Sequence, residues 1–301
     1  MSASDIDFAR PHSILFATDL GSRCDRALDR AVQLARAWKS RLVVLTVLDP
    51  GVASAKRAEH SDQPSWRLPL DPRVLAERAL RADAAAGDVR IEFMVKEGHV
   101  GQMIRDAAVT RDCGLIVTGQ GRSAGLLNPS SGSNVDWLVR HCGIPLLVVR
   151  RRVHAPYRSA VAASDFSDSA LHALKVARVL FSEVEFALLH AFGTPHAGML
   201  GIDRALLRQR AHDHAVGESE QFLVRSGVPA DVRSRMPVLI EYGEPDEVLD
   251  TYVRDHDIDL AVIGSHGRTA LFDVLIGSVA SRILKTAGCD VLCVREPRAR
   301  G

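Results

Sequence analysis

The sequence predicts an α/β protein built from two tandem domains, each with a five-stranded parallel sheet in a Rossmann-like arrangement. Three observations support this prediction. The chain repeats itself at a nearly constant offset, short apolar runs alternate with helical patterns, and a length of 301 residues suits two domains. The repeat period is far too long for a solenoid, so we interpret it as a duplicated domain.

The repeat is clearest at the start of each half. Ile14–Ala35 resembles Ala160–Phe181 at an offset of 146, which aligns Asp19 with Asp165. Later in each half the offset becomes 145, so that Gly98 aligns with Gly243 and Gly119 with Gly264, for example. We therefore expect one domain at residues 1–152 and a second at 157–301, joined by a short basic, proline-marked connector.

The first four elements of the second half follow from composition and periodicity. Val161–Ala163 is a short apolar run, typical of a strand, and Ser167–Phe181 carries apolar residues at helical spacing. Phe186–Leu189 is again continuously apolar, whereas Ala205–Arg225 is a long, polar-faced helical pattern. One strand–helix unit is thus followed by another.

The remaining elements follow the same alternation. Glycine and proline mark the starts of both helices, at Gly243-Glu-Pro245 and at Gly277. Continuously apolar strands that alternate with helices indicate a parallel sheet covered on both faces, with ligands bound beyond the carboxyl ends of the strands. The expected elements are strands at 238–240, 260–263 and 291–294, and helices at 246–255 and 278–286.

The composition argues against nucleic-acid binding, membrane insertion and secretion. With 38 basic and 37 acidic residues, the chain has no overall charge that favours nucleic acid or a membrane surface. The start of the chain has no signal-peptide pattern, and no apolar run approaches the roughly 18 residues of a membrane span. We expect a cytoplasmic protein that neither binds nucleic acid nor inserts into a membrane.

The cysteines suggest neither a disulfide framework nor a metal site. Their number is odd and no two form a C-x-x-C pair, so we interpret all five as structural or incidental. They are Cys24, Cys113, Cys142, Cys289 and Cys293.

Glycines cluster where the fourth strand of the second half ends. Gly264 ends that strand, Gly267 follows in the loop, and Gly277-Ser278 begins a helix whose expected core face includes Val279. Glycine permits positive φ and close approach of a ligand to the main chain. A helix start offers unpaired N–H groups and a positive dipole end that suit a phosphate. Alternatively, Ser278 is only an N-cap and Gly277 only a turn residue.

The G-x2-G-x9-G-S spacing, with an aspartate at the end of the first strand, resembles the universal stress protein family, and in particular its ATP-binding branch. The stretches ASDFSDSALHAL and IGSHGR are also family-like, and the similarity covers nearly the whole chain. The resemblance implies ATP with Mg²⁺ as the ligand. It places the adenosine portion at Asp165 and the phosphates at the glycine loop, with Val279 at the helix start. The implied phosphate-binding residues are Gly264, Gly267, Arg268, Gly277 and Ser278.

Two side chains in this loop also suit phosphate chemically. His266 and Arg268 can both donate to an anion, and Arg268 does so as a permanent cation. The alternative for Arg268 is a solvated loop charge.

The first half departs from this pattern. Its outer glycines, Gly119 and Gly132, keep the thirteen-residue separation of the second half, but the middle glycine moves to Gly121 and Arg122 aligns with Gly267. Asp19 is retained. We expect nucleotide chiefly in the second domain, and whether the first domain binds it stays open. Its candidate residues are Asp19, Gly119, Gly132 and Ser133.

Competing motifs are weaker. The stretches GQGRSA and GRSAG (within 119–125) match a dinucleotide fingerprint and a nucleophile elbow. Both motifs require a helix that begins directly after the loop, and the residues that follow are not helical. No Walker A motif is present. The first-strand loop Ser164–Asp168 lacks the glycines of pyrophosphate-binding adenylating enzymes.

We therefore expect a regulatory ATP-binding protein rather than an enzyme. Nothing in the loop supplies an evident general base, so any hydrolysis should be slow, and ATP would act by a population shift that an unidentified protein partner recognises. The alternatives are an ATP-using enzyme, with slow ATPase, adenylating or phosphotransfer activity, and an interaction scaffold with vestigial sites. The resemblance also implies that the two domain copies pair through Leu146–Val149 and Val291–Val294, so that one chain mimics a dimer internally. We further expect two chains to associate as a homodimer.

Overall fold

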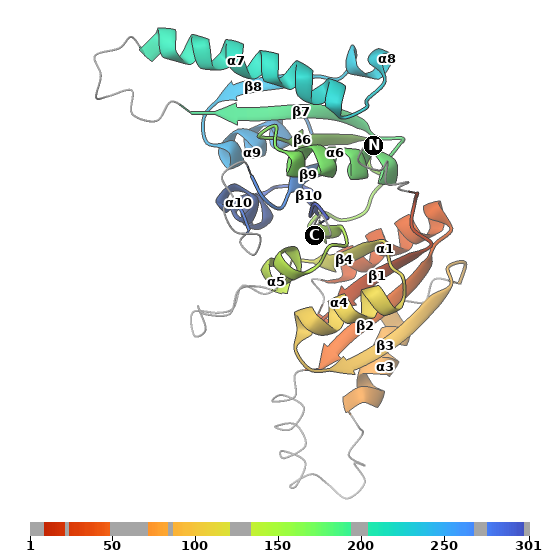
Figure 1. The fold of residues 1–301 in the computed structure, drawn as a ribbon. Helices are drawn as coiled ribbons and strands as arrows, with labels where there is room; N and C mark the ends of the chain where they lie inside the picture. The colour runs from red at the N-terminus through yellow and green to blue at the C-terminus, as the bar shows by residue number, and fades with distance from the viewer. Residues whose placement is uncertain are drawn as a thin grey trace, which may run out of the picture. The chain divides into compact units, whose positions relative to one another are not determined.

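The computed structural model describes residues 9–21, 24–48, 72–83, 87–120, 134–193, 204–267 and 276–297. The chain forms two compact units, an N-terminal unit from Arg10 to His154 and a C-terminal unit from Ala155 onward (Figure 1). No helix in the described ranges is long and apolar enough to cross a bilayer.

The N-terminal unit is a five-stranded parallel sheet with the strand order β3-β2-β1-β4-β5. Its first strand is almost fully buried, with Ile14 and Leu15 at 0% exposure, which explains the continuously apolar sequence. Its elements are β1 Ser13–Thr18, α1 Asp25–Trp38, β2 Arg41–Leu48, α3 Pro72–Asp83, β3 Ile91–Glu97, α4 Val100–Thr110, β4 Leu115–Gly119, α5 Asn134–His141 and β5 Leu146–Val149.

The C-terminal unit has the same parallel arrangement in the order β10-β9-β6-β7-β8. Its elements are β6 Ser159–Ala163, α6 Asp168–Leu180, β7 Glu185–Phe192, α7 Arg204–Arg225, α8 Ala230–Arg233, β8 Val238–Tyr242, α9 Pro245–Asp255, β9 Leu260–Gly264, α10 Ser278–Thr286 and β10 Asp290–Val294. The α/β fold with two parallel-sheet domains is confirmed, as is every strand and helix expected here. The four-residue helix α8 was not expected, because a single turn carries no periodicity.

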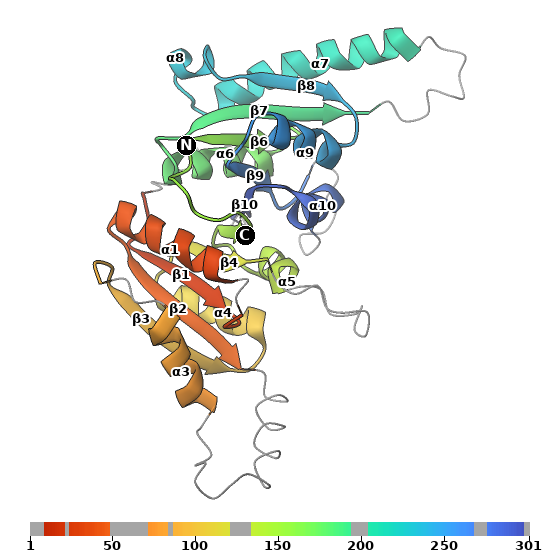
Figure 2. The same cartoon turned by 180° about the vertical axis from the view of Figure 1, so that it is seen from behind.

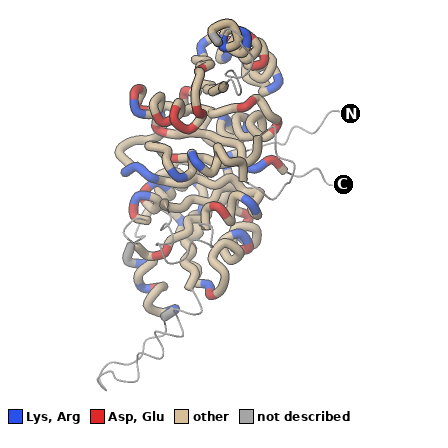
Figure 3. The backbone as a smooth tube through the Cα atoms, turned by 90° about the vertical axis from the view of Figure 1, so that its left-hand side faces the viewer, with Lys and Arg blue, Asp and Glu red and all other residues tan. Residues whose placement is uncertain are grey.

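Helices cover both faces of each sheet, as Figures 1 and 2 show from opposite sides. On one face of the C-terminal unit, α6 and α7 are joined by an ion pair between Asp168 and Arg225. Arg282 of α10 lies 2.8 Å from Asp246 of α9, which joins that second pair of helices. Basic and acidic residues are interspersed along the backbone (Figure 3).

The two units share their unusual backbone conformations as well as their topology. Leu20 and Phe166 both have left-handed φ angles (60° and 63°) in the loop after the first strand of each unit. Gly98 and Gly243 have φ of 142° and 150°, a region that essentially only glycine occupies, just before α4 and α9. The glycine pair that aligns in sequence is therefore a pair that the backbone requires.

Burial explains four of the five cysteines. Cys113, Cys142, Cys289 and Cys293 are at most 4% exposed. Burial raises the pKa of the Cys113 thiol to about 11 and that of Cys293 to about 12. These thiols are protonated at neutral pH and pack as small apolar groups, as expected.

A polar pair lies inside the C-terminal unit. The hydroxyl of Tyr157 donates to the carboxylate of Asp290 at 2.6 Å, and Asp290 is completely buried at the start of β10. The Tyr157 ring also packs edge-on against Phe181, with ring centroids 5.4 Å apart. The chain before β6 is thereby fixed to the strand β10.

We expect Tyr157→Phe to lower the free energy of unfolding by about 1–3 kcal/mol, because a buried carboxylate loses a donor. Urea unfolding followed by circular dichroism measures this. Tyr252→Phe is the matched control, since the Tyr252 hydroxyl has no hydrogen-bond partner within the described ranges; it should change stability by less than about 0.5 kcal/mol. Equal stabilities of both variants would contradict the expectation.

Candidate functional site

A tight turn holds Asp165 at the carboxyl edge of the C-terminal sheet. Ser164 Oγ accepts the N–H of Phe166 at 2.9 Å, and Asp165 Oδ1 accepts the N–H of Ser167 at 3.1 Å. Ser167 then caps α6 by accepting the N–H of Ala170 at 3.2 Å. These bonds stabilise the left-handed conformation of Phe166 and fix the half-buried aspartate in place.

Ser265 joins the two ends of the glycine motif. Its carbonyl accepts the N–H of Gly277 at 3.1 Å, and its own N–H donates to the carbonyl of Val294 in β10 at 3.0 Å. Its hydroxyl lies 2.6 Å from Nδ1 of His266, and the residue is completely buried. The start of α10 is thus tied directly to the end of β9.

The glycines of the motif do not use the positive φ that glycine permits. The positive-φ glycines of the described ranges are Gly98, Gly227 and Gly243, and Gly277 has φ −57°. Neighbouring atoms explain two of the motif's glycines instead.

Gly264 has no room for a side chain, and a side chain at Gly267 would displace the Asp165 carboxylate. A Cβ at Gly264 would lie 2.7 Å from Ser169 Oγ and 3.1 Å from the Ala170 nitrogen, because α6 packs directly on the strand end. A Cβ at Gly267 would lie 2.7 Å from Asp165 Oδ2. At Gly277 the nearest atoms are 3.8 Å away, so this position alone has room for a side chain.

These groups surround a cavity of about 380 Å³ at the carboxyl ends of β6, β7 and β9. It brings together all the residues of this unit that the sequence singled out, except Arg268, which lies outside the described residues. The lining includes Asp165, Gly264, His266, Gly267, Gly277, Ser278 and Val279.

The start of α10 differs from expectation in two details. Gly277 is the N-cap and Ser278 the first helical residue, so the alternative of Ser278 as N-cap is wrong. Val279 was expected on the core face of the helix, but it is only half-buried and lines the cavity. Its neighbour Ala280 is buried instead. Because a glycine N-cap has no side chain, it supplies no acceptor for the first-turn N–H groups, and the residues of that turn line the cavity.

The opposite wall was largely missed from the sequence. It consists of Leu189, His190 and Ala191 at the end of β7, with Pro245 at the start of α9. Nδ1 of His190 lies 2.8 Å from the Ser164 carbonyl, so this nitrogen carries the proton and donates. The ring stacks on Phe166 at 4.3 Å between centroids, so His190 is a packed, hydrogen-bonded histidine.

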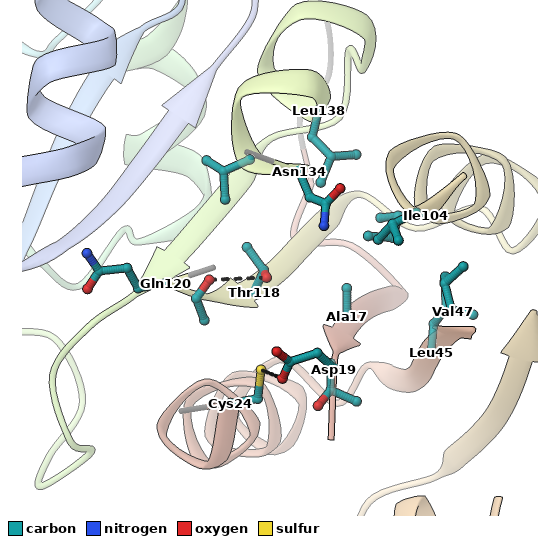
Figure 4. Close-up of a pocket in the computed structure, with 14 residues that line it drawn as sticks. Ala17, Asp19, Cys24, Leu45, Val47, Ile104, Thr118, Gln120, Asn134 and Leu138 are labelled. Atoms are coloured by element: carbon teal, nitrogen blue, oxygen red, sulfur yellow. Dashed lines mark hydrogen bonds between the residues drawn. The ribbon is translucent and has the colours of Figure 1, made fainter. Parts of the chain in front are cut away.

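The N-terminal unit has a corresponding, smaller cavity of about 220 Å³ (Figure 4). The same turn forms its base, since Thr18 Oγ1 accepts the N–H of Leu20 and Asp19 Oδ1 that of Gly21, both at 2.9 Å. Asp19 and Gly119 line the cavity as expected, whereas Gly132 and Ser133 lie outside the described residues. The lining also includes Leu45, Val47, Val100, Ile104, Thr118, Gln120, Asn134, Val135 and Leu138.

Cys24 is the unexpected member of this cavity. It lines the cavity beside Asp19, with its Sγ 3.2 Å from Asp19 Oδ1, and burial raises the pKa of its thiol (Figure 4). The interpretation of all five cysteines as structural or incidental is therefore incomplete. No sequence signal indicated this position, whereas Asn134 could have been found, because it follows Gly132-Ser133 directly.

The described residues contain no cluster of three or more histidine, cysteine, aspartate or glutamate side chains that could hold a metal ion. A divalent cation at either cavity would therefore depend on a ligand for most of its coordination. The cavities themselves offer main-chain groups, apolar walls and one carboxylate each.

Comparison with known proteins gives one consistent result. The model of the universal stress protein family matches residues 11–150 and 156–295. The chain is 28% identical to universal stress protein MJ0531 of Methanocaldococcus jannaschii over 151 residues, 47% of this chain and 84% of that protein. It is 25% identical to universal stress protein MJ0577 of the same organism over 158 residues, 46% of this chain and 96% of that protein.

The fold is also similar to a solved structure over nearly its full length. A universal stress protein from Archaeoglobus fulgidus DSM 4304 has a TM-score of 0.60 and 16% identity, covering 95% of this chain and 97% of that one. At this identity the likeness concerns the fold alone.

The glycine contacts predict effects of different size for the same substitution at two positions. Gly264→Ala should lower the free energy of unfolding by about 1–3 kcal/mol, since its Cβ overlaps the first turn of α6. Gly277→Ala should change it by less than about 1 kcal/mol, because its Cβ has room. Urea unfolding compares them. A larger loss at Gly277 than at Gly264 would contradict this assignment of roles.

Proposed function

The chain belongs to the universal stress protein family, whose role is in the stress response, and on this premise we propose that its C-terminal unit is a regulatory ATP-binding module. The observation that supports the proposal most is the cavity of about 380 Å³ in which Asp165, the main chain of the glycine loop and the start of α10 converge. Its size lies within the roughly 300–1,000 Å³ typical of small-molecule sites.

The two sides of the cavity suit different parts of a nucleotide. Leu189, Ala191 and Pro245 with the packed His190 ring form a mostly apolar wall that suits a purine base. The opposite side presents the glycine loop and the first turn of α10, whose N–H groups and dipole favour a phosphate chain. His266 and Arg268 are proposed to assist there.

Asp165 lies between these two regions. Its carboxylate can accept hydrogen bonds from ribose hydroxyls, but its Oδ2 packs against Gly267, where it would repel a bare phosphate. Mg²⁺ on the phosphates removes most of that repulsion. Because the described residues offer no metal cluster, the phosphates themselves would supply most of the magnesium ligands.

The side chains of the cavity favour a regulatory role over catalysis. Its titratable groups within the described ranges are Asp165, His190 and His266. Each has one atom in a hydrogen bond that shapes the local loop, to Ser167, Ser164 and Ser265 respectively. None is evidently aimed as a general base, so ATP would act by stabilising the conformation that a protein partner recognises. Association of two chains into a homodimer stays a prediction.

We expect ATP with Mg²⁺ to bind the full chain, and Gly277→Gln to weaken this binding at least tenfold, because the glutamine side chain occupies the phosphate region while its Cβ has room. Isothermal titration calorimetry measures both. Gly143→Gln is the control, since a Cβ there meets nothing within 4 Å and Gly143 does not line either cavity. ATP binding that is equal in all three proteins would refute the proposed site.

Turnover separates the regulatory function from an enzymatic one. With saturating Mg-ATP we expect phosphate release far below the roughly 1–100 s⁻¹ of kinases, because no general base is positioned. A steady-state phosphate assay on the full chain measures the rate. Turnover in the kinase range would favour an ATP-using enzyme, and absence of any nucleotide binding would favour a scaffold.

A further inference from the structure

Arg282 of α10 joins two helices whose first turns contribute to the C-terminal cavity. Its Nη2 lies 3.0 Å from Glu244 Oε2 and 2.8 Å from Asp246 Oδ1, and its Nε donates to the same Oδ1 at 2.9 Å. Glu244 is the N-cap residue of α9, and Asp246 belongs to its first turn. The Asp246 side chain is only 15% exposed, so water screens this pair less than a pair on the open surface.

These ion pairs lie beside the lining of the cavity. Pro245, between the two acidic residues, lines the cavity, and so do Ile283 and the residues 278–280 of α10, whereas Arg282 and its two partners are outside the described lining. The helices α9 and α10 lie side by side in both views of the fold (Figures 1 and 2). Pro245 belongs to the apolar wall and the start of α10 to the opposite side, so the ion pairs influence the spacing of these two sides.

The N-terminal unit makes the same connection between its helices with different chemistry. With the offset of 145, the positions of the arginine and of its two acidic partners are occupied by Trp137, His99 and Gly101. The rings of Trp137 and His99 lie 5.2 Å apart between centroids, and a Cβ at Gly101 would overlap the Trp137 ring. Val100, at the position of Pro245, lines the N-terminal cavity. The contact beside the cavity is thus kept in both units, although the residues that make it have all changed.

We propose that Arg282 is a positioning residue for the ligand of the C-terminal cavity. Through Asp246 and Glu244 it holds the apolar wall and the start of α10 at the spacing that the ligand requires, so the affinity of the site depends on ion pairs outside it. A site whose sides are fixed before the ligand arrives loses less affinity to their ordering. The choice of ATP as the ligand rests on the proposed function.

Isothermal titration calorimetry of Mg-ATP into the full chain tests the proposal with Arg282→Gln, which removes the charge and keeps a polar side chain. We expect binding at least fivefold weaker than in the wild type. Arg254→Gln is the matched control, because Arg254 is in the last turn of α9, pairs with Asp250 and is outside the described lining; it should change the affinity less than twofold. Equal affinities of Arg282→Gln and the wild type overturn the proposal, as do equal losses in the two variants.

A second variant separates positioning from the effect of charge alone. Asp246→Asn makes the unit less negative, which by itself favours a polyanion such as ATP. If Arg282 acts through Asp246, this variant should instead weaken ATP binding at least threefold. The double variant should then bind within twofold of Arg282→Gln, since both changes remove one contact. Tighter binding by Asp246→Asn, or losses that multiply in the double variant, contradict the proposal. Asp246→Asn takes the place of Arg282→Gln should the latter not fold.

Hydrogen exchange of the ligand-free chain measures the positioning without ATP. In Arg282→Gln, peptides that contain the first turns of α9 and α10 should exchange at least threefold faster than in the wild type, whereas Arg254→Gln should leave them unchanged. Unchanged exchange in Arg282→Gln overturns the proposal. If the wild type binds no ATP in calorimetry, the proposed function fails, and the exchange rates alone decide whether Arg282 positions the two sides of the cavity.

Discussion

The hydrogen bond between the N–H of Gly277 and the carbonyl of Ser265 determines the geometry of the C-terminal cavity. It brings the start of α10 to the end of β9, although nine residues separate the last two glycines of the motif in sequence. Ser265 is itself anchored to Val294 in the neighbouring strand, and it is completely buried. The site is therefore built on the sheet and presents mostly main chain, which places few demands on side-chain identity around it.

Much of the fold could be predicted because each signal was local. The helix expected at 278–286 is observed at Ser278–Thr286. It was predictable because a glycine precedes it and its apolar residues are regularly spaced. The roles of the glycines could not be predicted, because they depend on residues distant in sequence. Gly264 is required by Ser169 of α6 and Gly267 by Asp165, about 100 positions earlier, and a linear pattern does not show such contacts.

The parts of the candidate site with local sequence signals were predictable, and the parts formed by contacts between distant residues were not. The aspartate, the glycines and the helix start were found because they follow strands, and the carboxyl ends of parallel strands share one edge. The walls were missed, because Leu189 and Pro245 are ordinary strand-end and helix-start residues until the sheet brings them together. The position of Cys24 in the other cavity was missed for the same reason. Its sequence context gives no indication that its sulfur lies beside Asp19.

The paired left-handed residues have a consequence for the history of the molecule. Leu20 and Phe166 share a backbone conformation that is costly for residues other than glycine, and the turn that supports it is the same in both units. Such a repeated exception is most simply inherited, so the turn predates the duplication while its central side chain diverged afterwards. In one descendant that side chain became an aromatic platform for His190. After the duplication, the same turn therefore came to support an aromatic contact in one of the two units.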